Sequence, residues 1–154
     1  MTDHSHQQRR LLFLCTGNYY RSRFAEILFN ALIDKTALDW IAFSRGIALE
    51  RGINNVGRLS HYTQLALQAR GILMPRPLPF PQQLQRQDLH AAHHIIALKE
   101  AEHRPLLEKK FPDCPGTIEF WHIDDLDQAP PDVALTAIED EIHKLLCRLR
   151  TVPT

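Results

Sequence analysis

The sequence has no long apolar run, no excess of either charge and few cysteines, and each absence excludes a class of protein. No stretch approaches the ~20 apolar residues that a membrane-spanning helix requires, so we expect no membrane association. Lys and Arg together number 18, as do Asp and Glu, and the formal net charge is zero. Without a global basic field, nucleic acid is not an expected partner, and any site for an anion must be local.

Only three cysteines are present, Cys15, Cys114 and Cys147. Because this number is odd, at least one thiol of a monomer must be unpaired. Residues 1–10 are polar, and the apolar run at 11–14 is too short for the hydrophobic segment of a secretory signal. We therefore expect a cytoplasmic, reducing environment in which free thiols persist.

The chain is long enough for one domain with one sizeable core. It has 154 residues, of which 44% are hydrophobic and 23% are charged, as in ordinary soluble proteins. We expect residues 1–8 to form a polar, flexible N-terminus and residues 9–151 to form a single domain.

Strands and helices are predicted to alternate along this domain. Hydrophobic periodicity and β-propensity predict strands over residues 9–15, 38–44, 93–98 and 117–123. Helices are predicted over residues 22–34, 60–69, 84–91 and 99–110, and from Pro131 or Asp132 onward. Ser60 is the expected cap of the second helix. Residues 45–59 are predicted to be loop, and the proline-rich segment 74–81 cannot form regular structure.

This order of elements predicts an α/β fold. Strands that alternate with helices form parallel sheets through right-handed crossovers. We expect a small three-layer sandwich, in which helices cover both faces of a four-stranded parallel sheet. Ligands of such sheets bind beyond the carboxyl ends of the strands, and Cys15 lies at the end of the first strand.

The sequence CTGNYYRS at residues 15–22 joins the first strand to the first helix. A loop that enters a helix N-terminus can direct its N–H groups at an anion, and the helix dipole adds positive potential. Gly17 allows close approach of the backbone, Asn18 tolerates unusual φ, and Arg21 offers a planar fork for two phosphate oxygens. A thiol beneath such a loop ionises more readily than a free one, so Cys15 is a candidate nucleophile.

This loop resembles the signature of the low-molecular-weight protein tyrosine phosphatases. In that signature a cysteine is followed by five residues, then arginine and serine, and a Gly-Asn pair lies inside it. Only Cys15 fits, because no arginine stands six residues beyond either of the other cysteines. The sequence SRG at residues 44–46, where the family often has Ser-Ala-Gly, and an acidic loop late in the chain extend the resemblance.

The resemblance implies a metal-independent phosphatase without a cofactor. It would hydrolyse phosphate monoesters, above all protein phosphotyrosine, through a phosphocysteine on Cys15, with Arg21 as the phosphate clamp. Ser22 would donate a hydrogen bond to the sulfur, and Asn18 would hold the shape of the loop. The expected partner is a phosphorylated protein or a small phosphomonoester, and phosphate, vanadate or sulfate would occupy the site. The implied phosphate-binding residues are Thr16, Gly17, Asn18, Tyr19, Tyr20 and Ser22.

The general acid is the weakest part of the resemblance. The family carries it as Asp-Pro in a loop after the last strand, but here residues 120–132 read FWHIDDLDQAPPD, and none of the aspartates precedes proline. The spacing from the strand favours Asp125, with Leu126 in place of proline, ahead of Asp124 and then Asp127. The two tyrosines that follow the acid in the family are also absent.

Three other interpretations compete with this one. A non-catalytic module that binds phosphate or phosphopeptides would keep the loop, and the altered acid loop favours it. Arsenate reductases of the same fold need two further cysteines after the third helix, and residues 72–92 contain none. A metal site at His90, His93 and His94 is disfavoured, because no carboxylate or thiol pattern accompanies these histidines.

Overall fold

A parallel sheet forms the middle layer of the protein, whose structure is a computed structural model that describes residues 8–114 and 116–151. Its four strands lie in the order β2-β1-β3-β4 and all pair in parallel, which confirms the predicted α/β fold. Of the segment expected to be a flexible N-terminus, residues 1–7 lie outside the described residues. The strands are β1 (Arg9–Cys15), β2 (Trp40–Gly46), β3 (His94–Ala97) and β4 (Ile118–Phe120).

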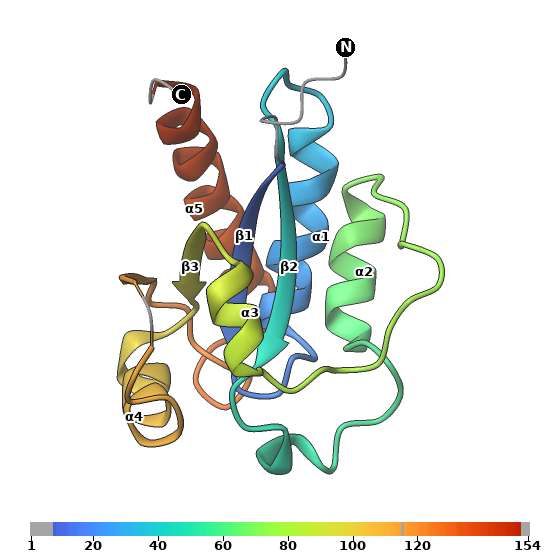
Figure 1. Cartoon of the computed structure of the whole chain (residues 1–154). Helices are drawn as coiled ribbons and strands as arrows, with labels where there is room; N and C mark the ends of the chain where they lie inside the picture. The colour runs from blue at the N-terminus through green and yellow to red at the C-terminus, as the bar shows by residue number, and fades with distance from the viewer. Residues whose placement is uncertain (1–7, 115, 152–154) are drawn as a thin grey trace.

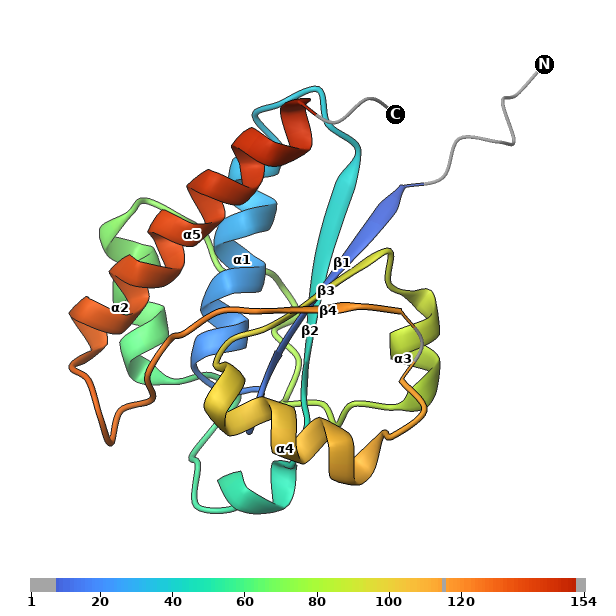
Figure 2. The same ribbon diagram turned by 90° about the vertical axis from the view of Figure 1, so that its left-hand side faces the viewer.

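Helices cover both faces of this sheet (Figures 1 and 2). One face carries α1 (Arg21–Ile33), α2 (His61–Ala69) and α5 (Pro131–Thr151). The other face carries α3 (Arg86–Ala91) and α4 (Glu100–Lys110). Among the described residues, no helix combines the length and the apolar character needed to cross a membrane.

The central strand β1 has helices on both sides and is therefore apolar at consecutive positions. Because side chains alternate between the faces of a strand, Leu11 and Phe13 pack toward α1 and α5, whereas Leu12 and Leu14 pack toward α3 and α4. The run ends at Cys15, so burial of β1 places the thiol at the carboxyl edge of the sheet.

Several predicted boundaries were wrong. The strand expected over residues 38–44 lies two residues later, and the strand expected over 117–123 is only three residues long. Beyond β4 the chain leaves regular pairing, although the N–H of Trp121 still bonds to the carbonyl of Ala97. The predicted loop 45–59 contains a 3₁₀ helix, Leu49–Gly52.

Ser60 lies at the N-cap position of α2 but does not cap the helix as predicted. Its side chain makes no capping hydrogen bond. Instead its main-chain N–H donates to the carbonyl of Tyr19 at 3.0 Å. The start of α2 is thereby attached to the loop that follows β1.

Removal of the Phe13 ring should destabilise the fold. The ring is fully buried, 6.3 Å from the Phe29 ring and 5.7 Å from the Trp121 ring between centroids. We expect Phe13→Ala to lower the free energy of unfolding by about 3–5 kcal/mol, measured by urea unfolding followed through tryptophan fluorescence. Ile41→Ala, at a site 40% exposed, should cost less than about 1 kcal/mol. Equal losses in the two variants would contradict this assignment of the core.

Candidate active site

The loop after β1 is attached to the rest of the sheet edge through its carbonyl groups. The N–H of Ile47 donates to the carbonyl of Cys15 at 2.9 Å, and the N–H of Ala48 donates to that of Thr16 at 3.0 Å. Both donors follow β2, whose last residue Gly46 is paired with Cys15 in the sheet. The loop carbonyls therefore face β2.

The main-chain N–H groups of the same loop have no such partners. Among the described residues, none accepts a hydrogen bond from the N–H groups of residues 16–20. Helix α1 begins immediately afterwards, at Arg21. Unpaired N–H groups at a helix N-terminus attract anions, and the helix dipole adds to the attraction. This part of the sheet edge therefore has the properties of an anion site.

Asn18 holds the loop in an unusual conformation. Its φ is +51°, in the left-handed region, and its side chain is buried. Its Nδ2 donates to the hydroxyls of Ser22 at 3.0 Å and Ser44 at 2.9 Å, and its Oδ1 accepts from the N–H of Gln82 at 2.8 Å. Ser44 in turn donates to the half-buried Glu26, whose pKa is raised by desolvation. These contacts are those that the expected loop-holding role requires.

The thiol of Cys15 lies beneath the loop. It is 3% exposed, and its Sγ donates to the hydroxyl of Ser22 at 2.9 Å. If the sulfur loses its proton, the same hydroxyl is placed to donate to it instead. The structure thus brings together the first and last residues of the signature.

Arg21 is charged, although its side chain is only 2% exposed. Its Nη1 donates to the carbonyl of Ile123 at 2.9 Å, and its Nη2 lies 3.4 Å from Oδ2 of Asp125. Burial alone would lower the pKa of Arg21, but the hydrogen bond to Glu102 and the nearby charges raise it overall. The guanidinium therefore supplies a permanent positive charge beside Cys15.

Glu102 and His103 were not among the predicted site residues, yet both contact the loop. Thr16 donates its hydroxyl proton to Oε2 of Glu102, and Nε2 of His103 lies 3.1 Å from the same hydroxyl oxygen. The N–H of Lys99 donates to Nδ1 of His103 at 3.0 Å. In the neutral ring the proton is then on Nε2, from which it can be donated to Thr16.

The ionisation states of this pair follow from their surroundings. Burial lowers the pKa of His103, which favours the neutral ring. Burial also tends to raise the pKa of Glu102, but hydrogen bonds from His103 and Arg21 outweigh it, and the pKa falls far below its usual range. Glu102 is therefore a carboxylate.

The acidic loop contributes Asp125, Leu126 and Asp127 to the lining of the cavity that also contains Cys15. Asp125 accepts a hydrogen bond from the N–H of Leu126 at 2.9 Å and is within ion-pair distance of Arg21. Asp124, by contrast, pairs with Lys99 at 2.8 Å. A cavity of about 290 Å³ is lined by Cys15, Gly17, Tyr19, Tyr20, Arg21, Asn55, Asp125, Leu126 and Asp127.

The two tyrosines of the loop differ in their surroundings. The hydroxyl of Tyr19 donates to the carbonyl of Val56 at 2.5 Å, at the rim of the cavity. The hydroxyl of Tyr20 is buried without a hydrogen-bond partner among the described residues. Burial, followed by the charge of Asp125, raises the pKa of Tyr20 to about 12. Tyr20 therefore stays neutral.

The histidines near β3 have structural partners. Nδ1 of His93 accepts from the N–H of Arg10 at 2.9 Å, and Nε2 of His94 lies 2.9 Å from a carboxylate oxygen of Glu119. Within the described part of the chain, no three or more His, Cys, Asp or Glu side chains are grouped to hold a metal ion.

The contribution of α4 could have been found from one rule. Polar side chains that directly follow a parallel strand lie at the ligand-binding edge of the sheet. Lys99, Glu102 and His103 follow β3 in this way. Nothing in their spacing, however, indicates that Glu102 contacts Arg21.

Gly46 should be required for the shape of the loop. A Cβ at this position would lie 2.8 Å from the carbonyl oxygen of Thr16 and 2.9 Å from the main-chain nitrogen of Asn18. We expect Gly46→Ala to weaken the binding of inorganic phosphate, measured by calorimetry, about tenfold or more. Gly71, with φ of +72° and open space around it, serves as control. Gly71→Ala should lower stability by about 1 kcal/mol but leave phosphate binding unchanged.

His103 should make stability depend on pH. Its pKa is lowered in the fold, so below the ordinary histidine pKa of about 6.5 the unfolded chain binds one more proton than the folded chain. The stabilising contribution is thus complete above that pH and is lost as the pH falls. We expect the free energy of unfolding, measured in urea, to fall less between pH 7.5 and pH 5.5 in His103→Gln than in the unaltered protein. Identical losses would contradict a buried, neutral His103.

Comparisons with known proteins agree with this geometry. A family model described as low molecular weight phosphotyrosine protein phosphatase matches residues 10–119. YfkJ from Bacillus subtilis is 24% identical, with 94% of this chain and 96% of that chain covered and a TM-score of 0.80. A low molecular weight protein tyrosine phosphatase from T. tengcongensis is 24% identical, with 91% and 99% covered and a TM-score of 0.75.

Another solved structure of the same fold is that of an arginine phosphatase. The YwlE arginine phosphatase from Geobacillus stearothermophilus is 22% identical, with 93% of this chain and 94% of that chain covered and a TM-score of 0.74. At 22–24% identity, these structural similarities show that the chain shares the fold of these proteins. No curated protein sequence matches the chain. Because the family model spans more than half of the sequence, the chain belongs to the low molecular weight phosphotyrosine protein phosphatase family.

Proposed function

We propose that this protein hydrolyses phosphate monoesters, with protein phosphotyrosine as the substrate class, through a phosphocysteine on Cys15. Members of its family are cysteine-dependent phosphatases. The observation that carries the proposal is the position of the Cys15 thiol beneath unpaired N–H groups, beside the charged Arg21. A tetrahedral phosphate bound by these groups would present its phosphorus to the sulfur.

In the first step the Cys15 thiolate attacks phosphorus, an S–P bond forms, and the P–O bond to the leaving group breaks. The loop N–H groups and Arg21 stabilise the charge on the equatorial oxygens of the transition state. Protonated Asp125, which lines the same cavity as Cys15, donates its proton to the leaving oxygen.

In the second step water attacks the phosphocysteine. Asp125, now a carboxylate, accepts a proton from the water, an O–P bond forms and the S–P bond breaks. The hydroxyl of Ser22, 2.9 Å from the sulfur, can donate to the departing thiolate and stabilise it. Cys15 is regenerated, and inorganic phosphate is released. Because this cycle needs a reduced thiol, we also propose a reducing compartment such as the cytoplasm.

The walls of the cavity support an aryl phosphate as substrate. Tyr19, Tyr20 and Leu126 offer apolar surface around the space above Cys15, which suits the ring of phosphotyrosine. The arginine phosphatase among the structural neighbours makes phosphoarginine the alternative to test. A phosphotyrosine peptide should be hydrolysed faster than the matching phosphoarginine peptide.

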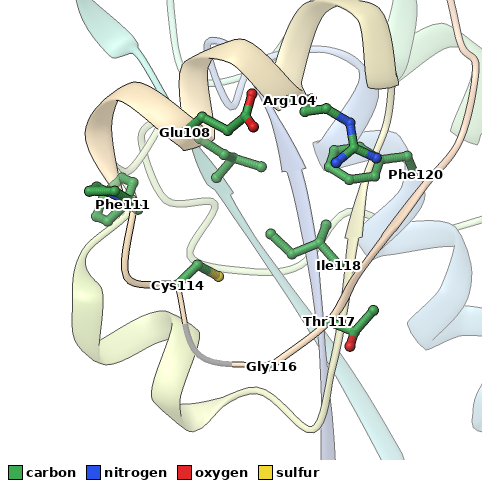
Figure 3. Close-up of a pocket in the computed structure, with 10 residues that line it drawn as sticks. Arg104, Glu108, Phe111, Cys114, Gly116, Thr117, Ile118 and Phe120 are labelled. Atoms are coloured by element: carbon green, nitrogen blue, oxygen red, sulfur yellow. The ribbon is translucent and has the colours of Figure 1, made fainter.

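The other cysteines give no support to arsenate reduction. Cys114 lines a separate hollow of about 640 Å³ between α4 and residues 111–120 (Figure 3). Cys147 is exposed on α5. Neither residue lines the cavity above Cys15, and relay of a disulfide would require them to approach it.

Hydrolysis of p-nitrophenyl phosphate between pH 5 and 8, with a chelator present, tests the reaction. We expect turnover that falls toward pH 8 as the general acid loses its proton, and no turnover from Cys15→Ser. Asp125→Asn should lower kcat about 10²-fold and remove the alkaline decline. Asp132→Asn is the matched control, because Asp132 lies in the first turn of α5 and not in the lining of the cavity.

Three outcomes would count against the proposal. Unchanged activity of Cys15→Ser would exclude the nucleophile, and unchanged activity of Asp125→Asn would exclude the acid. An inert protein that binds inorganic phosphate would instead indicate a non-catalytic phosphate-binding module.

A further inference from the structure

Glu102 contacts two members of the phosphate-binding loop without belonging to it. Its Oε1 accepts from Nη1 of Arg21 at 3.2 Å, and its Oε2 accepts from Nη2 at 2.7 Å. The same Oε2 accepts the hydroxyl proton of Thr16. One carboxylate on α4 is therefore bonded both to the arginine clamp and to the residue that follows Cys15.

The way in which Glu102 binds Arg21 determines which side of the guanidinium remains available. A guanidinium has an end-on edge, formed by Nη1 and Nη2, and a side-on edge, formed by Nε and Nη2. Glu102 occupies the end-on edge, and the carbonyl of Ile123 takes a further proton of Nη1. On the side-on edge, Oδ2 of Asp125 lies 3.4 Å from Nη2. Among the residues described by the structure, none accepts a hydrogen bond from Nε.

His103 supports this arrangement through Thr16. Its Nδ1 accepts from the N–H of Lys99, and its Nε2 lies 3.1 Å from the Thr16 hydroxyl oxygen. The Nε2 proton can therefore be shared between the Thr16 hydroxyl and Oε2 of Glu102, which lies 3.2 Å from Nε2, and the Thr16 proton remains for Glu102. These contacts connect His103 to Thr16, Thr16 to Glu102, and Glu102 to Arg21, and all of them are partly buried.

We propose that Glu102 is a positioning residue for phosphate transfer: by holding the end-on edge of Arg21 and the Thr16 hydroxyl, it turns the side-on edge of the guanidinium toward the phosphate above Cys15. This inference rests on the proposed phosphatase function. Glu102 itself does not touch the substrate. Its carboxylate would hold the guanidinium of Arg21 in a fixed orientation before the substrate binds. The guanidinium would then need no reorientation as the transition state forms.

The first test compares Glu102→Gln with Glu100→Gln. The amide introduced by Glu102→Gln would offer one acceptor oxygen in place of two and would place its N–H₂ group against the other donor. With p-nitrophenyl phosphate we expect Glu102→Gln to lower kcat about tenfold or more. KM should stay constant or fall, because the substrate dianion no longer faces a carboxylate. Glu100 is on the same helix, is half-exposed and pairs with Arg104, so Glu100→Gln should change neither constant.

A second variant separates position from charge. Glu102→Asp keeps the negative charge, but its shorter side chain cannot reach Arg21 and Thr16 together. We expect kcat to fall in Glu102→Asp as well, whereas a role of charge alone would leave it at the original value. A residue needed only for folding would lower the thermal unfolding midpoint without separating kcat from KM.

An NMR measurement tests the geometry without turnover. In the unaltered protein the Nε–H signal of Arg21 should be resolved and should shift when inorganic phosphate is added, because this edge faces the anion. In Glu102→Gln the signal should broaden or merge with those of mobile arginines. The Arg21 signal is assigned by its absence from the spectrum of Arg21→Lys.

The outcomes distinguish this proposal from the function on which it rests. If the unaltered protein fails to hydrolyse the ester, but its phosphate-dependent Arg21 signal is lost in Glu102→Gln, the hydrolytic function would be overturned and the role of Glu102 in orienting Arg21 would be supported. An active protein in which Glu102→Gln keeps both kcat and the Nε–H signal would overturn the positioning role alone. An Arg21 signal unaffected by phosphate would also overturn it.

Discussion

The site depends on the direction of the peptide groups in the loop after β1. Each peptide has a carbonyl and an N–H on opposite sides, so fixing the carbonyls on one side exposes the N–H groups on the other. Ile47 and Ala48 hold the carbonyls of Cys15 and Thr16 toward β2. Because β1 and β2 are parallel neighbours, this attachment follows directly from the order of strands in the sheet.

Two carboxyl groups already lie beside the positive charge of Arg21 before any substrate binds. Arg21 is positive, Glu102 is a carboxylate, and Asp125 lies within 3.4 Å of Arg21. A phosphate dianion must therefore be held largely by uncharged N–H groups and by the free edge of the guanidinium. Such groups stabilise charge effectively only when they are oriented in advance. The side chain of Asn18, which bonds to α1, to β2 and to the segment before α3, is consistent with that requirement.

The sequence was sufficient to predict the sheet, the helices and the family to which the chain belongs. Their signals are local: an apolar run, a change to helical periodicity, and a motif within residues 15–22. At Ser60 the predicted helix start was correct, but the predicted capping bond was wrong. A tertiary contact replaces it: the N–H of Ser60 bonds to Tyr19, and its side chain does not cap α2. Glu102 could not be placed because its partner Arg21 is 81 positions away, and no periodicity reports a contact between the end of β3 and the start of α1.

The same long-range bonding offers a physical answer to the missing proline of the acid loop. A proline after the acid would restrict the backbone at that point, and Leu126 does not. Here the start of α4 takes over part of that constraint. Lys99 pairs with Asp124 at 2.8 Å and donates to Gln128 at 2.6 Å, on either side of Asp125. The same residue donates its N–H to His103, which reaches Thr16. Residues 99–103 thus contact both the acidic loop and the loop after β1. These contacts add to the local hydrogen bonds that the N–H groups of Gln128 and Ala129 make to the carbonyl of Asp125, and together they restrict where Asp125 can lie relative to Cys15.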